Sequence, residues 1–205
     1  MEGPQPMNWD ALIQLDQRLT LWLNQLGTPA WDPFWLLLSD IKIWFPAYAV
    51  VMACLIWKLG WKKGLAVILS LVATVVFIDQ TANAVKDGFE RLRPCFNAWM
   101  IANGVRTPYG LIGPLYGFFS AHAANSFGFA IASYLGFQLN DPQHSYKVYG
   151  WCVFIWAGLL SFSRIMMAAH FLGDVLVGTC YGLAVGLTIA GITWHIMVRA
   201  LKGRQ

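Results

Sequence analysis

Long apolar runs separated by short polar turns dominate the chain from residue 43 onward. Five runs stand out, at about 43–59, 64–85, 118–137, 146–162 and 171–197. A bilayer core is crossed by about 20 apolar residues, and by fewer where neighbouring helices or local thinning help. The pattern therefore predicts an all-α integral membrane protein, a bundle of about five transmembrane helices that forms a single domain over residues 1–205.

The segment 8–26 has a different pattern. Its apolar residues recur at steps of three and four, which is the period of a helix with one apolar face; they are Leu12, Leu15, Leu19, Trp22, Leu23 and Leu26. Asp10, Asp16 and Arg18 lie between them. This pattern predicts an amphipathic helix in the membrane interface. The alternative is an ordinary helix packed on the bundle.

Composition supports the membrane assignment. Of the 205 residues, 58% are hydrophobic and 12% are charged, whereas soluble domains carry about a quarter of charged residues. Eleven Trp and nineteen Gly fit the aromatic belts and close helix packing of membrane proteins. We therefore expect membrane lipids as the surroundings and no nucleic-acid partner.

The acidic residues are unevenly distributed over the two ends of the predicted bundle, which share the fourteen basic residues equally. One end carries seven basic residues with Asp141 as its single acidic residue: Lys58, Lys62, Lys63, Lys147, Arg199, Lys202 and Arg204. Loops rich in Lys and Arg stay in the cytoplasm. We therefore expect a cytoplasmic C-terminus, with the N-terminus and the loop 86–116 on the outer side.

Polar residues with phosphate chemistry gather at the outer ends of the predicted spans. They form three blocks, Lys86 to Arg93-Pro94, then Ser120-Ala121-His122, then Ser163-Arg164 with His170 and Asp174. Three cationic side chains suit phosphate oxygens. The helix start at Ser120 adds unpaired N–H groups that favour an anion.

Two histidines complete a hydrolytic set. His170 and Asp174 are four residues apart and share a helical face, so the carboxylate can orient the imidazole for attack. His122 can protonate a leaving oxygen. Phosphoryl transfer needs mainly positioning and charge stabilisation, which cationic side chains and two histidines can supply without a metal.

The three blocks together resemble the type 2 phosphatidic acid phosphatase superfamily, the membrane lipid phosphate phosphatases. The resemblance rests on Lys86-x6-Arg93-Pro94, Ser120-Ala121-His122 and Ser163-Arg164-x5-His170-x3-Asp174. The middle block departs from the family pattern Pro-Ser-Gly-His, because Phe119 and Ala121 replace Pro and Gly.

The resemblance implies a role for each residue. His170 forms a phosphohistidine, Asp174 orients His170, and His122 is the general acid. Lys86, Arg93, Ser120 and Arg164 bind the phosphate. The family mechanism uses no metal and no cofactor, so we expect neither here.

Each of these residues also has a structural interpretation. Lys86, Arg93 and Arg164 can be interfacial anchors, and His122 and His170 can be polar residues at helix ends. Arg91 and Arg106 are interpreted as loop charges, with contact to a lipid head group as the alternative. Asp79 is interpreted as a buried hydrogen-bond partner or a support for Lys86. Gly178, Gly182 and Gly186 predict close helix packing; we expect a monomer, with homodimerisation through these glycines as the alternative. The loop 96–116 either caps the site or is a passive connector.

The substrate is a separate question, because a fold does not determine it. Five spans and an interfacial helix favour a lipid phosphate or diphosphate in the bilayer. An outward-facing site in a bacterial inner (plasma) membrane favours undecaprenyl diphosphate. Phosphatidylglycerol phosphate, phosphatidic acid and lipid A phosphate are the alternatives, and a non-enzymatic lipid-binding or transport protein is a remote one.

Overall fold

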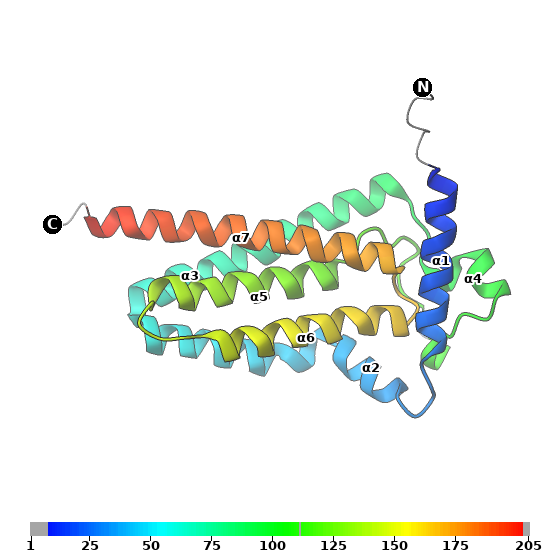
Figure 1. Cartoon of the computed structure of the whole chain (residues 1–205), viewed down its shortest axis with the longest axis horizontal. Helices are drawn as coiled ribbons and strands as arrows, with labels where there is room; N and C mark the ends of the chain where they lie inside the picture. The colour runs from blue at the N-terminus through cyan, green and yellow to red at the C-terminus, as the bar shows by residue number, and fades with distance from the viewer. Residues whose placement is uncertain (1–7, 111, 203–205) are drawn as a thin grey trace, which may run out of the picture.

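The computed structural model describes residues 8–110 and 112–202. They form an all-helical bundle whose helices run along one long axis, with two N-terminal helices at one end (Figure 1). In chain order the helices are α1 (Trp9–Gln25), α2 (Asp32–Ser39), α3 (Phe45–Phe89), α4 (Ala98–Ala102), α5 (Ala121–Asn140), α6 (Lys147–Met166) and α7 (Leu172–Lys202). Short 3₁₀ turns cover Ile41–Trp44, Pro94–Phe96 and Pro108–Gly110.

The helix α3 holds two of the predicted spans. Its 45 residues reverse direction at Gly60, where φ is 76° and ψ is 164°, a conformation that glycine adopts without the penalty of a Cβ atom. Next to this turn the two arms pack closely, since a Cβ on Gly64 would lie 2.8 Å from the Ile56 Cα. Figure 1 shows the arms running from the end that carries α2 to the opposite end and back.

Among the described residues, three helical stretches are long and apolar enough to cross a membrane by length and composition alone: Ile41–Phe89, Lys147–Met166 and Leu172–Arg199. The first contains both arms of α3. The fourth long helix, α5, lies among α3, α6 and α7. Because protein surrounds it, α5 accommodates buried polar residues such as Ser126, whose hydroxyl lies 3.4 Å from that of Ser161 on α6.

The predicted glycine face fixes α7 against α5. Added Cβ atoms at Gly178, Gly182 and Gly186 would lie 2.5, 2.1 and 2.6 Å from backbone oxygens of α5 or its N-cap. Contacts this short leave no room for any side chain. These glycines therefore pack within the chain and hold the start of α7 beside the start of α5, where His170 and His122 lie.

The helix α1 lies across one end of the bundle (Figure 1). Its side toward the bundle is polar: Asn24 is buried and donates to the carbonyl oxygens of Ile165 and Met166 at 3.0 and 3.1 Å. Of the predicted apolar residues, Leu23 packs against buried residues of the bundle, whereas Leu15, Trp22 and Leu26 are exposed. The helix therefore contacts the bundle through polar groups and Leu23, and keeps most of its apolar face free, as the interfacial assignment expects.

Candidate active site

The predicted site residues converge at the end of the bundle that carries α1. Segments distant in sequence contribute to a single cavity of about 690 Å³ lined by Lys86, Arg93, His122, Arg164 and His170. The rest of its wall is mainly apolar, and both arms of α3 supply it, with Phe45, Tyr48 and Met52 on one arm and Leu71, Val72, Val75 and Val76 on the other. The cavity thus joins a cationic end to an apolar channel.

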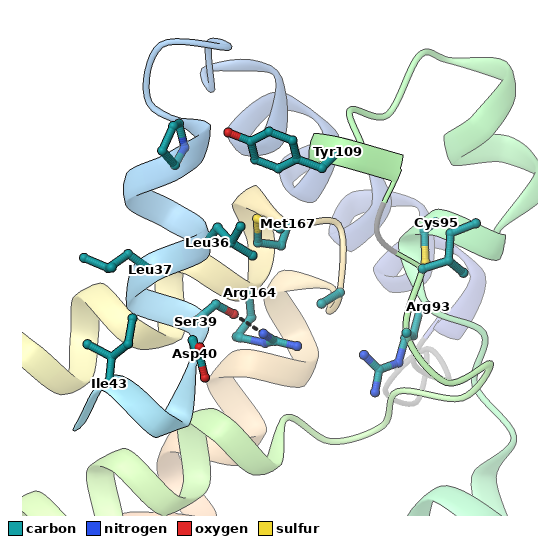
Figure 2. A pocket seen from close by; sticks show the side chains of 14 residues that line it. Leu36, Leu37, Ser39, Asp40, Ile43, Arg93, Cys95, Tyr109, Arg164 and Met167 are labelled. Atoms are coloured by element: carbon teal, nitrogen blue, oxygen red, sulfur yellow. Dashed lines mark hydrogen bonds between the residues drawn. The ribbon is translucent and has the colours of Figure 1, made fainter. Parts of the chain in front are cut away.

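Two arginines define the cationic end. Figure 2 shows the guanidinium groups of Arg93 and Arg164 directed toward the space between them. Arg93 Nε donates to the Tyr116 carbonyl oxygen at 3.1 Å, and Arg164 donates to the Ser39 hydroxyl on α2. Arg164 Nε is buried without a hydrogen-bond partner among the described residues. Positive groups held without a carboxylate between them attract an anion.

His170 lies in the turn between α6 and α7. Its side chain is 2% exposed. Burial, and then the positive charges of Arg164, Arg93 and Lys86, hold the pKa of His170 well below its ordinary value. The imidazole is therefore neutral at physiological pH, which is the state that a nucleophile requires.

Asp174 lies on the first turn of α7 and is fully buried. Its Oδ2 is 3.7 Å from His170 Nδ1 and accepts a hydrogen bond from the Phe171 N–H at 3.0 Å. Because Nδ1 is the ring nitrogen next to the carboxylate, Nε2 is the one left for a substrate. The predicted pair is thus adjacent, although its separation exceeds a hydrogen bond.

Ser120 is placed differently from the other phosphate-binding candidates. It is fully buried and caps α5, where its hydroxyl accepts from the Ala123 N–H at 3.4 Å. Its own N–H donates to the Asp174 carbonyl oxygen at 3.0 Å. The lining of the cavity does not include it. A direct contact between Ser120 and phosphate stays a prediction, while its bond to Asp174 ties α5 to α7.

A second cavity opens on the other side of the arginine pair. Its volume is about 560 Å³, and Arg93, Gly113 and Arg164 line both cavities. The remaining wall comes from α2 and from the loop, with Leu36, Ser39 and Asp40 on one side and Tyr109 and Ile112 on the other. The loop 96–116 therefore forms part of a wall next to the site.

Within the described residues, no three His, Cys, Asp or Glu side chains gather as a metal site would require. Asp79 hydrogen-bonds Asn125 at 2.6 Å, and both line the larger cavity below Lys86. This contact matches the interpretation of Asp79 as a hydrogen-bond partner.

Comparison with known proteins decides the family. A sequence model of the PAP2 superfamily matches residues 63–199, a region that contains every predicted site residue. The chain belongs to the PAP2 superfamily. The resemblance inferred from the three blocks is thereby confirmed, and the chain is a membrane phosphatase.

Two curated relatives of this chain are both lipid A 4′-phosphatases. The chain is 31% identical over 174 residues to a lipid A 4′-phosphatase of Bacteroides thetaiotaomicron, covering 84% of this chain and 74% of the relative. It is 29% identical over 178 residues to a lipid A 4′-phosphatase of Porphyromonas gingivalis, covering 86% and 72%.

Two solved structures share the PAP2 fold. One is the PAP2 type phosphatidylglycerolphosphate phosphatase of Bacillus subtilis, with a TM-score of 0.66, 18% identity and coverage of 89% of this chain and 86% of that one. The other is Aquifex aeolicus LpxE, with a TM-score of 0.55, 20% identity and coverage of 84% and 92%. At these identities the likeness concerns the fold, and it agrees with the all-α membrane bundle predicted from sequence.

Two arginines of this PAP2 phosphatase have partners that the sequence interpretation missed. Arg91 pairs with Asp16 at 2.6 Å and also with Asp174, and Arg106 pairs with Asp32 at 2.9 Å. The sequence alone indicates loop charges for both. Ser39, which binds Arg164, was also not foreseen. Their partners lie between 74 and 125 residues away in sequence, so no local spacing could indicate them.

Proposed function

We propose that this PAP2 phosphatase removes a phosphate monoester from a lipid A-type glycolipid at the outer face of a bacterial inner membrane. The observation that carries the proposal is the larger cavity, where Lys86, Arg93 and Arg164 face two histidines above an apolar channel between the arms of α3. A charged head group and an acyl chain have separate places in such a cavity.

The substrate class follows from two further observations. Both curated relatives are lipid A 4′-phosphatases, and the chain covers 74% and 72% of their lengths. The second cavity extends from the arginine pair beneath α2, which leaves room for a head group larger than phosphate. These observations move the preference from undecaprenyl diphosphate, favoured by the sequence alone, to lipid A.

The proposed reaction has two steps. His170 Nε2 attacks phosphorus, the ester P–O bond breaks, and the leaving sugar oxygen takes a proton from His122. A water molecule, deprotonated by His122, then attacks the phosphohistidine and releases inorganic phosphate with neutral His170. Lys86, Arg93 and Arg164 stabilise the charge on the phosphoryl oxygens in both steps.

The test is phosphate release from lipid A by the detergent-purified protein in EDTA, beside undecaprenyl diphosphate under the same conditions. We expect faster release from lipid A, and a loss of at least about 1,000-fold for His170→Ala. His144→Ala, an exposed histidine at the opposite end of the bundle, is the control and should retain activity. Preference for undecaprenyl diphosphate would overturn the substrate, and an active His170→Ala would overturn the mechanism.

A further inference from the structure

The start of α7, which carries Asp174, is held by side chains of α1. The Leu172 N–H donates to Thr20 Oγ1 at 2.8 Å, and the Gly173 N–H donates to Asp16 Oδ1 at 2.7 Å. These are first-turn N–H groups that have no partner within the helix itself. Gly173 permits the approach, because a Cβ there would lie 2.9 Å from Asp16 Oδ2. The amphipathic helix therefore supplies the N-terminal cap of the catalytic helix.

Arg91 joins the same two helices through its guanidinium fork. Nη2 binds Asp16 Oδ2 at 2.6 Å and Nη1 binds Asp174 Oδ1. The guanidinium carbon also lies 4.4 Å from the centre of the Phe171 ring, next to His170 in sequence. A planar guanidinium whose two Nη atoms bind two different carboxylates holds one carboxylate in place relative to the other. Arg91 thus constrains the carboxylate and the turn that presents the nucleophile.

The two carboxylate oxygens of Asp174 have different partners, and one of these oxygens lies near His170. Oδ1 is taken by Arg91, while Oδ2 accepts from the Phe171 N–H and lies 3.7 Å from His170 Nδ1. The carboxylate is fully buried, and an unpaired buried charge is costly. Without Arg91 the carboxylate would lack its one cationic partner within salt-bridge distance among the described residues.

Arg91 itself lines neither cavity beside the phosphate-binding arginines. We propose that Arg91, held by Asp16 of α1, is a positioning residue that fixes the Asp174 carboxylate toward His170 for phosphoryl transfer. The proposal rests on the proposed role of His170 and Asp174. It links the interfacial helix to the reaction through a chain of three side chains.

The test compares Arg91→Gln with Asp32→Asn. Asp32 pairs with Arg106 at 2.9 Å. The exposed fractions of the Arg106 and Asp32 side chains, 25% and 11%, resemble the 26% and 16% of Arg91 and Asp16. Both ion pairs lie outside the two cavities, so Asp32→Asn is a matched control. We expect Arg91→Gln to lower kcat by about 10- to 100-fold, the size of loss seen in other enzymes when a residue that orients a reactive group is removed. The KM should stay within about threefold of the native value. Asp32→Asn should keep kcat within about twofold.

Two further variants separate positioning from folding. Arg91→Lys keeps the charge without the fork and should recover part of the lost kcat. When Asp174→Asn is already present, adding Arg91→Gln should lower kcat by less than a further factor of about three, because the two residues act as a unit. If the loss of kcat in the double variant equalled the product of the losses in the two single variants, Arg91 would act independently of Asp174. A raised KM with native kcat would make it a substrate-binding residue instead.

A measurement independent of turnover distinguishes failure of this proposal from failure of the proposed function. The ring NMR signals of His170, assigned with His170→Asn, should shift in Arg91→Gln and Asp16→Asn and stay in place in Asp32→Asn. Turnover would be followed on whichever lipid phosphate the native protein hydrolyses, so a wrong choice of lipid leaves the comparison intact. Unchanged His170 signals in Arg91→Gln would overturn the positioning role.

Discussion

At the scale of single residues, the neutral imidazole of His170 leads to a prediction about pH. The folded protein holds the pKa of His170 well below its ordinary value, first by burial and then through Arg164, Arg93 and Lys86. We expect the His170 ring signals to stay constant from pH 8 to about 5.5, through the range in which free histidine, at about 6.5, takes up its proton. NMR titration with free histidine as an internal reference measures this.

The same shift has a consequence for stability. Below pH 6.5 the unfolded chain binds a proton at residue 170 that the folded protein does not bind, so this site makes unfolding easier as the pH falls. The contribution is absent above pH 6.5. A His170 signal that titrates together with the reference would show that the three cations and burial do not govern the ring.

The individual site residues were more predictable than their supports. His170, Asp174 and His122 follow from chemistry at short spacings, and Lys86, Arg93 and Arg164 from charge at span ends. Arg91 was missed because both of its partners come from distant helices. Such pairs are properties of the tertiary structure, so periodicity and motif spacing carry no signal for them.

At the scale of elements, the contact between α5 and α7 decides whether the two histidines face the same cavity. Gly182 is pressed against the Ala124 carbonyl oxygen, which a Cβ would approach to 2.1 Å. We expect Gly182→Ala to lower the free energy of unfolding by about 1–3 kcal/mol, as overpacked sites do, and to lower kcat as well. Thermal unfolding and turnover in the same detergent measure both effects.

Gly191 provides the control on the same helix. A Cβ at this position meets nothing within 4 Å, so Gly191→Ala should leave stability unchanged within about 1 kcal/mol and leave kcat unchanged. If both substitutions had equal effects, glycine flexibility rather than close packing would explain the role of Gly182.

Hydropathy predicts the positions of the helices better than it predicts the turns between them. Gly60 lies between the first two predicted spans, but only its φ of 76° shows that the chain reverses there within a few residues. The helix α2 was not predicted, since eight residues give too short a pattern. The side of α1 that meets the bundle is set by Asp16, Thr20 and Asn24, whose partners lie elsewhere in the chain.

At the scale of the whole molecule, the two ends of the bundle differ in charge and in chemistry. The end with α1 carries both cavities, and the opposite end carries the Gly60 turn, the connection between α5 and α6, and the end of α7 (Figure 1). Lys58, Lys62, Lys63 and Lys147 lie at this opposite end, whereas Arg204 lies outside the described residues. Loops rich in Lys and Arg stay in the cytoplasm, so an active site at the end away from these lysines is expected to face the exterior or periplasm.

This orientation yields a prediction with a built-in comparison. Asn103, after α4, and Ser145, between α5 and α6, are exposed at opposite ends of the bundle. After replacement of the four native cysteines, we expect a membrane-impermeant maleimide to label Asn103→Cys in cells whose inner membrane is intact, and not Ser145→Cys. Disrupting that membrane should make both label equally, because both positions are exposed in the folded protein. Labelling of Ser145→Cys alone in intact cells would place the catalytic end in the cytoplasm, and the lipid phosphate would then have to be reached from the inner leaflet.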